Sequence, residues 1–501
     1  MTQAPTVIAK LDTLTLNRAG KELLSGISLE ISRGEHLLFT GNAETARIVL
    51  EILAGIIHPG SGNRSFPALE EWVAANPDAD PLFSVNRFIV LVNARPDFRN
   101  RAHMADLYYQ QRFNSTENEN SLKVMEFLTE EAETSASQEN ISSVIKDFDL
   151  EALTHEPLIK LSSGETRRLQ LAAAMLKNPK LLLLDNPMAG LDAANRQHLE
   201  KVFIYLLQQG VTLVQTGNRQ FIPASVSRLV EFGDKEILSI EKPPFKTSVT
   251  RVQSQESAAA FPAIPVQNNS HFTEIVKMRD VSVRYGEKVI LQQINWTVLP
   301  GECWRLSGKN GAGKSTLISL INGDNPQAFA HDIILFDRKK GSGESIWDIK
   351  ARTGFFSPEL FRYFPREQRC IDVIESGFYD TSGLFRVSNT HYAASAREWL
   401  KYFQLDGYAG SSFAQVPETV QRICLLIRAL IKLPPLLLLD EPCQGLDDLL
   451  TEKFHRLLRE IYRRRRVSVV YVSHYDHELP DFITHELELD KGMIRRITHQ
   501  A

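Results

Sequence analysis

Cysteine is scarce in this chain of 501 residues, and its four cysteines show no metal-binding or redox spacing. Cys303, Cys370, Cys424 and Cys443 form neither a CxxC pair nor a Cys/His cluster. This argues against zinc sites and iron–sulfur clusters, which rest on closely spaced ligands. Reduced thiols in a cytosolic protein are the simplest interpretation.

The sequence also lacks a long apolar run. No stretch approaches the roughly 20 residues of a transmembrane helix. The start, MTQAPTVIAKLDTLTL, has no basic segment followed by an apolar core, so we do not expect a signal peptide. We expect a cytoplasmic protein, or one held peripherally at the inner face of the plasma membrane, where another chain would supply any membrane part.

An excess of charge of one sign is absent as well. The chain carries 57 Lys and Arg against 61 Asp and Glu, for a net charge of −4. Such a balance gives no strong nucleic-acid signature, because a surface built for polyanions is markedly basic. The basic run from Arg463 to Arg466 is interpreted as a solvated helix end.

What the chain does contain is a long internal repeat. Two stretches share a pattern of strand, Gly-Glu turn and second strand, namely Leu23–Asn42 and Ile290–Asn310. Further on, LLLLDNPMAGLD (Leu181–Asp192) matches LLLLDEPCQGLD (Leu436–Asp447). The match predicts a duplicated domain of ~240 residues. Continuous apolar runs that end in Asp suit strands buried on both faces, so the expected fold class is α/β, twice.

The two repeats are expected to be joined by a flexible linker. Residues 243–273 are rich in Pro, Ser, Gln and Ala and show no sustained period, which is typical of irregular chain. The predicted domains are therefore residues 1–242 and residues 274–501. A polar, acidic stretch at Asn114–Asn140 predicts a surface insertion or a helical cap within the first domain.

The second repeat contains a complete phosphate-binding loop. GKNGAGKS, Gly308–Ser315, satisfies GxxxxGK[ST] at every position, between a strand-like CWRLS and a helix-like TLISLING. Backbone N–H groups of such a loop surround phosphate oxygens, the lysine adds positive charge, and the last hydroxyl can ligate Mg²⁺. The expected phosphate-binding residues are Gly308, Asn310, Gly311, Ala312, Gly313, Lys314, Ser315 and Thr316, and Ser315 is also an expected metal ligand.

Residues for hydrolysis follow in the same repeat. Asp440, at the end of LLLLD, is expected to hold the Mg²⁺ shell, and Glu441 to polarise the attacking water. The alternative for Glu441 is a helix-capping acid. His474 ends a third apolar strand and is a candidate contact for the γ-phosphate, although a lone His at a strand end is often structural. Tyr285, ahead of the loop, is a candidate to stack on adenine, although exposed strand-end tyrosines are common.

The corresponding loop of the first repeat is degenerate. It reads GNAETARI, Gly41–Ile48, so Ala46 replaces the last Gly, Arg47 the Lys and Ile48 the metal-ligating hydroxyl. Arginine keeps the charge, but its bulky fork does not replace a compact ammonium in a tight loop. Isoleucine cannot ligate a metal.

The first repeat has also lost its hydrolytic residues. Asp185 remains, but Asn186 stands at the position of Glu441, and asparagine cannot accept a proton from water at neutral pH. Asn218 stands at the position of His474, and no aromatic equivalent of Tyr285 is found. These losses predict that this site does not hydrolyse nucleotide.

One motif is intact only in the first repeat. LSSGE, Leu161–Glu165, precedes a helix-like TRRLQLAAAML and predicts exposed N–H groups at a helix N-terminus. The aligned residues of the second repeat are Val416–Val420. There Pro417 removes an N–H group and a hydroxyl, and Glu418 would place a carboxylate near phosphate. At ~4 Å and an effective dielectric near 20, that repulsion is ~4 kcal/mol per charge pair.

Together these motifs resemble the ATP-binding-cassette (ABC) ATPase family. The resemblance covers nearly the whole chain apart from the linker. It identifies Gly308–Ser315 as Walker A, Leu436–Glu441 as Walker B, LSSGE as the signature and Gly445–Asp447 as a D-loop. It implies P-loop NTPase domains of the ABC type, each a mostly parallel sheet with an antiparallel β subdomain and a helical subdomain. ATP and Mg²⁺ are the implied cofactors.

The family also implies how the motifs combine. In ABC dimers each site pairs the Walker motifs of one domain with the signature of the other. The losses here are complementary, so we expect a head-to-tail intramolecular pair with one working site and no obligate homodimer. The implied residues across that interface are Ser162, Ser163 and Gly164 of the signature and Asp192 of the D-loop.

A more specific resemblance rests on Phe336–Phe361, which contains GSGESIWDIK, and on SSGETRR in the first domain. Both are similar to the ModF-type tandem ABC ATPases, also called photorepair protein PhrA and described as molybdate-transport ATP-binding proteins. In most ABC proteins a Gln that senses the permease follows the strand after Walker A. Here FFSPE, Phe355–Glu359, has none, and Asn93 is the nearest candidate in the first repeat.

Three function classes stay open at this point. The first is a transport ATPase that energises a separate membrane permease, for molybdate or another anion. The second is an ABC ATPase that acts on a cytosolic ribosomal, DNA-repair or stress complex. The third is a nucleotide-responsive binding module with negligible turnover, which the intact Glu441 and His474 disfavour.

Overall fold

The computed structural model describes most of the chain, in two compact units. The described residues of the first unit lie between 7 and 245, and those of the second between 261 and 499. The structure describes residues 7–18, 21–75, 85, 87–94, 121–132, 138–158, 161, 163–189, 191, 193–219, 221–245, 261–264, 272–286, 288–365, 367–446, 448–473 and 476–499.

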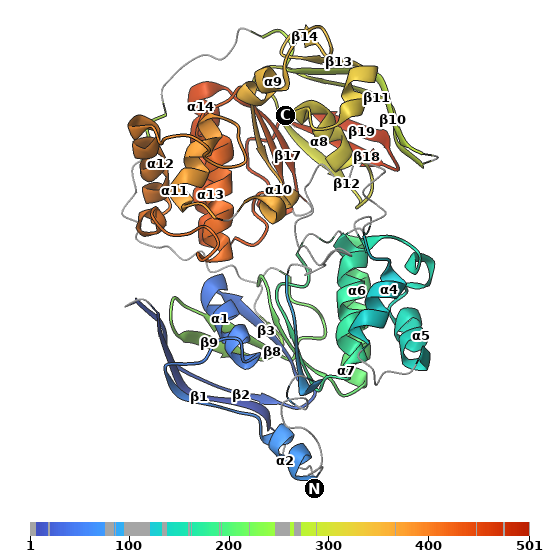
Figure 1. Cartoon of the computed structure of the whole chain (residues 1–501), viewed down its shortest axis with the longest axis vertical. Coiled ribbons are helices and arrows are strands. Elements are labelled where there is room, and N and C mark those ends of the chain that lie inside the picture. Colours follow the sequence, from blue (N-terminus) through green and yellow to red (C-terminus); the bar gives the residue numbers. More distant parts are fainter. Residues whose placement is uncertain are drawn as a thin grey trace. The chain divides into compact units, whose positions relative to one another are not determined.

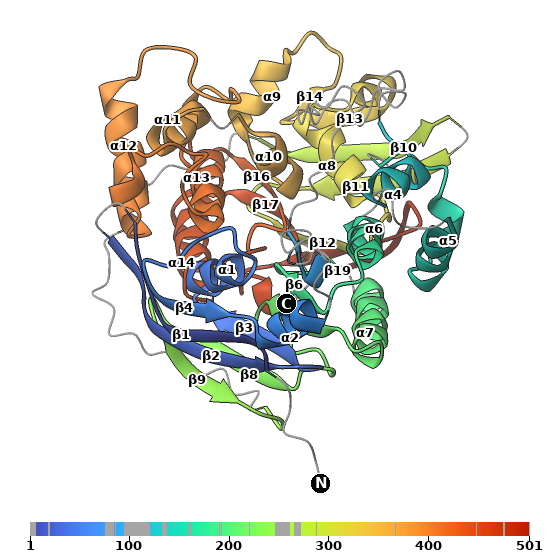
Figure 2. The ribbon, with the colours of Figure 1, turned by 60° about the horizontal axis from the view of Figure 1, so that its bottom comes forward.

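The first unit is built on a six-stranded sheet and a three-stranded antiparallel sheet (Figures 1 and 2). The strands of the larger sheet follow the order β5(Ile89–Val92)-β6(Leu181–Leu184)-β7(Thr212–Thr216)-β3(His36–Gly41)-β8(Arg228–Phe232)-β9(Ile237–Glu241). Those of the smaller sheet follow the order β2(Lys21–Ser32)-β1(Val7–Arg18)-β4(Ser61–Ser65). Only β9 runs antiparallel to its neighbour in the larger sheet.

The described helices of the first unit are α1(Ala43–Leu53), α2(Pro67–Ala75), α4(Val124–Glu131), α5(Gln138–Asp147), the short 3₁₀ helix η3(Glu151–Leu153), α6(Ser163–Leu176) and α7(Ala193–Gln208). These helices lie in two groups, which pack on opposite faces of the larger sheet: α1 and α2 with the antiparallel strands, and α4 to α7 on the other face (Figure 1).

The second unit repeats this plan (Figure 1). Its larger sheet follows the order β15(Thr353–Phe356)-β16(Leu436–Asp440)-β17(Ser468–Val472)-β12(Cys303–Gly308)-β18(His485–Asp490)-β19(Met493–His499), again with only the last strand antiparallel. Its antiparallel sheet follows the order β11(Lys288–Val298)-β10(Val276–Tyr285)-β13(Asp332–Leu335)-β14(Arg338–Lys339).

The described helices of the second unit complete the expected three parts: central sheet, antiparallel β subdomain and helical subdomain. They are α8(Lys314–Asn322), η5(Pro326–Ala330), α9(Ile346–Arg352), α10(Pro358–Tyr363), α11(Cys370–Glu375), η6(Ser376–Phe378), α12(Thr390–Tyr402), η7(Asp406–Tyr408), α13(Glu418–Leu430), α14(Asp448–Arg465) and η8(Asp476–Glu478). The α/β class and the duplication are confirmed.

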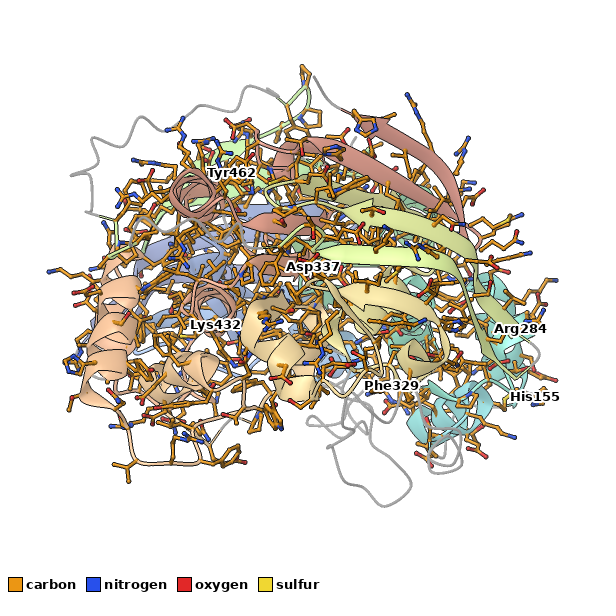
Figure 3. All side chains as sticks on the ribbon, turned by 90° about the horizontal axis from the view of Figure 1, so that it is seen from above. His155, Arg284, Phe329, Asp337, Lys432 and Tyr462 are labelled. Carbon is orange, nitrogen blue, oxygen red and sulfur yellow. The ribbon has the colours of Figure 1, made fainter. Side chains whose placement is uncertain are left out.

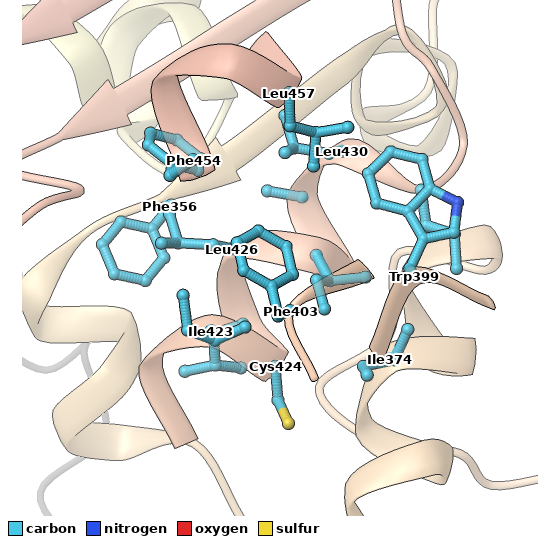
Figure 4. Packing of buried hydrophobic residues seen from close by; sticks show 14 of the residues in the cluster. Phe356, Ile374, Trp399, Phe403, Ile423, Cys424, Leu426, Leu430, Phe454 and Leu457 are labelled. Carbon is cyan, nitrogen blue, oxygen red and sulfur yellow. The ribbon is translucent and has the colours of Figure 1, made fainter. Parts of the chain in front are cut away.

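The central sheet of the second unit separates two apolar cores. Leu436 and Leu438 of β16 face the core that contains α8 and the antiparallel sheet, whereas Leu437 and Leu439 face the core made by the helices α11 to α14. This alternation explains why the whole strand is apolar, as the sequence predicted. Figure 4 shows part of the core that lies on the side of α11 to α14, where Leu426 of α13 is buried with Phe356 and Phe403.

A buried ion pair ties the helical subdomain to the chain that precedes β15. Lys432, labelled in Figure 3, follows α13 and donates to the carboxylate of Asp380 and to the carbonyl of Lys350. Burial lowers the pKa of the Lys432 ammonium to about 8, although the charge of Asp380 opposes this shift. The pair fixes the base of α13 against the segment that leads into the sheet.

Part of the expected linker is packed against the second unit. Residues 261–264 are described, and the side chain of Ile264 is only 3% exposed within the core around α13 and α14. Phe261 stacks on Tyr402 with ring centroids 5.5 Å apart, and the Arg464 guanidinium donates to the Ile264 carbonyl. The sequence did not predict that residues 261–264 pack in this way, because a run of four apolar residues, one of them Pro, is too short to show a periodic pattern.

Among the residues that the structure describes, no helix is long and apolar enough to cross a membrane.

We predict that Ile264→Ala destabilises the second unit by about 2–5 kcal/mol, because it removes a buried side chain and leaves a cavity. Thermal or urea unfolding of the full chain measures this loss. Val387→Ala, at a position that is 92% exposed, is the matched control and should change stability by less than about 0.5 kcal/mol. An Ile264→Ala variant as stable as the control would contradict this packing.

Candidate functional site

The phosphate-binding loop of the second unit lies between β12 and α8, as predicted. Gly308 has φ 139° and Gly313 φ 103°, backbone conformations that side chains disfavour. A Cβ at Gly308 would meet the Leu489 carbonyl oxygen at 2.3 Å, and one at Gly313 the Leu291 side chain at 2.6 Å. Because α8 begins only at Lys314, the residues between these glycines form a true loop.

Lys314 lies folded over this loop. Its buried ammonium donates to the carbonyls of Gly308, at 2.6 Å, and of Lys309, at 3.0 Å. Ser315 is exposed in the first turn of α8, beside Thr316. The arrangement brings an ammonium and a hydroxyl to one helix N-terminus, where the helix dipole also favours negative charge.

The two acids of the Walker B segment occupy the end of β16. Asp440 is 8% exposed, and the alternation along the strand turns it to the face that carries α8. Glu441 has a left-handed backbone with φ 47°, and its N–H donates to the Val472 carbonyl. Helix α14 begins only at Asp448, so Glu441 does not cap a helix.

A left-handed glutamate is uncommon, because its Cβ crowds the following carbonyl. Such strain persists where the surroundings hold it, and it gathers at functional sites. The role of Glu441 toward the attacking water stays a prediction.

Tyr285 ends β10 and is half-buried. Its hydroxyl accepts a hydrogen bond of 2.8 Å from the Asn325 side chain, which lies beyond the C-terminal end of α8. Burial raises the pKa of the Tyr285 phenol. The hydrogen bond thus ties Tyr285 to the chain that follows α8. Its stacking on adenine stays a prediction.

Several predicted residues cannot be placed. Ser162, Asp192 and His474 lie outside the described residues, as does the side chain of Ser163. Gly164, in the first turn of α6, is buried, and a Cβ there would meet the Asn195 side chain at 2.6 Å. The signature glycine therefore lets α6 approach α7 closely. Its role toward nucleotide stays a prediction, as do those of the unplaced residues.

The fold and loop agree with a family comparison. The model of the ABC transporter family matches this chain twice, over residues 24–189 and 291–444. The chain belongs to this family. Its members are ATP-binding proteins and ATPases, so the chain is an ABC-type ATPase. The tandem arrangement expected from the sequence is confirmed.

Relatives share this organisation. The ABC transporter ATP-binding protein ModF of Escherichia coli is 35% identical over 70% of this chain and 74% of its own length. An uncharacterised ABC transporter ATP-binding protein of Schizosaccharomyces pombe is 27% identical over 94% and 96%. A chain of the structure described as a model of ribosome-bound archaeal Pelota and ABCE1 aligns with a TM-score of 0.62 over 98% of this chain and 78% of that chain. At 16% identity this last likeness shows the fold alone.

In the first ABC unit the phosphate-binding loop is wound into a helix. Helix α1 begins at Ala43, four residues earlier than the aligned start of α8. Asn42 caps it, with its side-chain oxygen accepting from the Thr45 N–H at 3.0 Å, while the Ala46 N–H bonds to the Asn42 carbonyl. The N–H groups of Thr45 and Ala46 are therefore already bonded to the cap residue.

Sequence reasoning noted the substitutions here but missed the change of conformation. The signal was present: Asn42 is a favoured N-cap, and Ala43 and Glu44 favour a helix start. The aligned positions of Gly311 and Gly313 carry Glu44 and Ala46. Neither residue tolerates the positive φ that the loop requires.

Arg47, at the position of the Walker lysine, pairs with two acids of the first unit. Its Nε lies 3.8 Å from Asp185 Oδ2 and 3.0 Å from Glu51 Oε1. The other oxygen of Asp185 accepts from the Thr216 hydroxyl at 3.0 Å. Asn186 keeps the left-handed backbone of Glu441, with φ 43°. The acid that would hold Mg²⁺ is thus paired with the arginine that replaces the Walker lysine.

In the second unit, the residues at the position of the signature also bond within their own unit. Pro417 is the N-cap of α13 and provides no side-chain cap. Glu418 is tied back to Arg422 with a 3.0 Å ion pair, and the Arg422 guanidinium lies 4.4 Å from the Phe361 ring centroid. The sequence predicted that Glu418 would place a carboxylate near phosphate; the structure shows the carboxylate engaged with its own helix.

The segment that would carry the permease-sensing Gln turns directly into a helix. Ser357 follows β15 and caps α10, with its hydroxyl accepting from the Leu360 N–H, and Pro358 is the first helical residue. In the first unit Asn93 follows β5, and its carbonyl accepts from Arg167 of α6 at 2.8 Å. Neither segment presents a glutamine.

We predict that the chain binds one ATP equivalent, because only the second unit keeps an open phosphate loop. Lys314→Ala should weaken ATP binding by about 10- to 100-fold, since it removes a charged hydrogen-bond donor. Arg47→Ala, the matched substitution in the first unit, should leave one site of unchanged affinity. Equilibrium dialysis with radiolabelled ATP counts the sites. Two equivalents, or a loss of binding in Arg47→Ala, would contradict the closed first site.

Proposed function

We propose that this ABC ATPase hydrolyses ATP with Mg²⁺ at a single composite site, formed by the Walker motifs of the second unit and the LSSGE segment of the first. The observation that carries the proposal is the complementary pattern of the two units. The second has an open loop and a lost signature, whereas the first has a loop wound into helix α1 and an intact signature. Independent decay would rarely leave one complete set.

Each predicted site residue of the second unit has its own role in the proposed reaction. The loop N–H groups and Lys314 hold the phosphates. Ser315 and Asp440 would supply oxygen ligands for Mg²⁺, which binds few protein oxygens in such sites. Bound Mg²⁺ would neutralise charge on the phosphate oxygens. Glu441 orients and polarises the attacking water, and His474 contacts the γ-phosphate.

We further propose that hydrolysis energises a separate membrane permease, for an anion such as molybdate. The support is the 35% identity to ModF, an ABC transporter ATP-binding protein. In this scheme the chain works in the cytoplasm or at the inner face of the plasma membrane. The alternative is an ATPase that acts on a cytosolic ribosomal, DNA-repair or stress complex. The replacement of the Gln segment by Ser357 and helix α10 favours this alternative.

Glu441→Gln should reduce kcat for ATP hydrolysis by about 100-fold or more, because the amide cannot accept a proton from water. ATP affinity should stay within a few-fold of the wild type, since the phosphate loop is untouched. Steady-state hydrolysis and equilibrium binding measure the two effects. Full turnover in this variant would show that another group activates the water.

The composite site predicts different results for two opposite substitutions, in which each unit receives the residue that the other unit has at the aligned signature position. Ser163→Glu gives the first unit the residue found at the aligned position of the second, and should lower kcat by about tenfold or more through repulsion of the phosphates. The acid suits a helix N-terminus, so α6 should stay folded. Glu418→Ser, the reverse exchange, should leave hydrolysis unchanged. Equal effects of both would contradict the pairing; thermal unfolding controls for stability.

A pull-down separates the two partner classes. Glu441→Gln would be captured from whole cells, membranes included, with and without ATP, with Lys314→Ala as the control whose ATP binding is weakened. A multi-span membrane protein recovered only with ATP would support the permease. Ribosomal, DNA-repair or other soluble proteins with no membrane protein would overturn it and support the alternative.

A further inference from the structure

A hydrogen-bonded triangle of side chains lies directly behind the Walker B end of the second unit. Cys443 Sγ is 3.2 Å from the Tyr471 hydroxyl and 3.5 Å from His455 Nε2, and His455 Nε2 is 3.2 Å from the Tyr471 hydroxyl. Cys443 and Tyr471 are fully buried, and His455 is half-buried. None of the three belongs to the phosphate or metal site.

The triangle joins three elements. Cys443 lies in the turn after β16, Tyr471 on β17 and His455 on α14. Tyr471 belongs to the core on the side of α14, whereas Asp440 faces the side of α8. The three residues therefore lie on the opposite face of the sheet from the nucleotide loop, and the turn after β16 connects them to Glu441.

The turn that contains Cys443 also holds Glu441 in place. The Glu441 N–H bonds to the carbonyl of Val472, the residue after Tyr471. Gln444 N–H bonds back to the Glu441 carbonyl, and Leu446 N–H to the Cys443 carbonyl. Cys443 thus lies two residues from Glu441, in a turn that these backbone hydrogen bonds hold together.

The triangle can satisfy its polar atoms in either histidine tautomer. If Nε2 lacks a proton, it accepts from the tyrosine hydroxyl, whose oxygen accepts from the thiol. If Nε2 carries a proton, it donates to the tyrosine, which donates to the sulfur. Burial raises the pKa of both the Cys443 thiol and the Tyr471 phenol, so both groups keep their protons. A satisfied buried network rigidifies the elements it joins.

The first unit provides an internal comparison. Gln215 pairs with Leu184 of β6 as Tyr471 pairs with Leu439 of β16, so the two residues are equivalent. The aligned partners of Cys443 and His455 are Met188 and Glu200.

None of these residues can rebuild the triangle. Methionine carries no hydrogen to donate, and Glu200 instead accepts from the Ala224 backbone N–H at 3.0 Å. The polar triangle therefore accompanies the unit that keeps Glu441 and is missing from the unit that carries Asn186.

We propose that Cys443, His455 and Tyr471 are positioning residues for ATP hydrolysis, which lock the turn that presents Glu441 and leads into the D-loop. The inference rests on the proposed function, since it assigns these residues to the hydrolytic step and not to ATP binding. Loosening the turn should therefore lower kcat without a matching change in the KM for ATP.

The test compares variants that differ by single atoms. Tyr471→Phe removes one hydroxyl, and Cys443→Ala removes one thiol, and each should lower kcat on the order of 10- to 100-fold, with KM and ATP affinity within about twofold. Cys443→Ser keeps a hydroxyl that can bond to both partners and should recover most of the activity. Cys303→Ala removes another fully buried thiol from the same core, outside the triangle, and should keep wild-type kcat.

Thermal unfolding of each full-length variant distinguishes positioning from stability. Wild-type kcat in both Tyr471→Phe and Cys443→Ala, with only a lower Tm, would overturn the positioning role. Equal losses in Cys303→Ala and Cys443→Ala would also overturn it, because core packing would then explain them. A wild-type chain without ATPase activity that depends on Lys314 would instead overturn the proposed function, and the positioning role with it.

Discussion

The phosphate-binding loop depends on glycines that hold backbone conformations an α-helix cannot adopt, and this constraint separates the two units. In the second unit Gly308, Gly311 and Gly313 hold positive φ values, so the helix cannot start before Lys314. In the first unit the aligned stretch contains no glycine after Gly41, and a cap at Asn42 starts the helix early. The same fold thus carries an open loop in the second unit and a closed, helical one in the first.

The closed site shows how a lost ligand can be replaced by the protein itself. In a P-loop ATPase the Walker B aspartate is normally balanced by the bound Mg²⁺. In the first unit Arg47 takes over that balance by pairing with Asp185, and Thr216 satisfies its second oxygen. The unit can therefore fold around this site without nucleotide. Its remaining contribution would be the LSSGE segment, whose last residues begin α6 at Ser163.

The sequence predicted the α/β class, the duplication, the phosphate loop and the positions of Asp440 and Glu441, because each leaves a local pattern of glycines or apolar runs. It did not predict that Glu418 pairs with Arg422, since a charge alone does not reveal its partner. It also missed the triangle around Tyr471, whose members come from three elements and become neighbours only when β16, β17 and α14 pack. Contacts of that kind leave no spacing in the sequence.

Which segments surround the γ-phosphate is the central question, and vanadate photocleavage answers it most directly. Orthovanadate with Mg²⁺ and ADP occupies the place of the γ-phosphate, and ultraviolet light then cuts the backbone beside it. The wild-type chain should be cut within Gly308–Ser315 and also within Leu161–Glu165, and mass spectrometry would locate both cuts in one molecule. Cuts within Gly41–Ile48 or Val416–Val420, or a cut at Gly308–Ser315 alone, would contradict a single composite site.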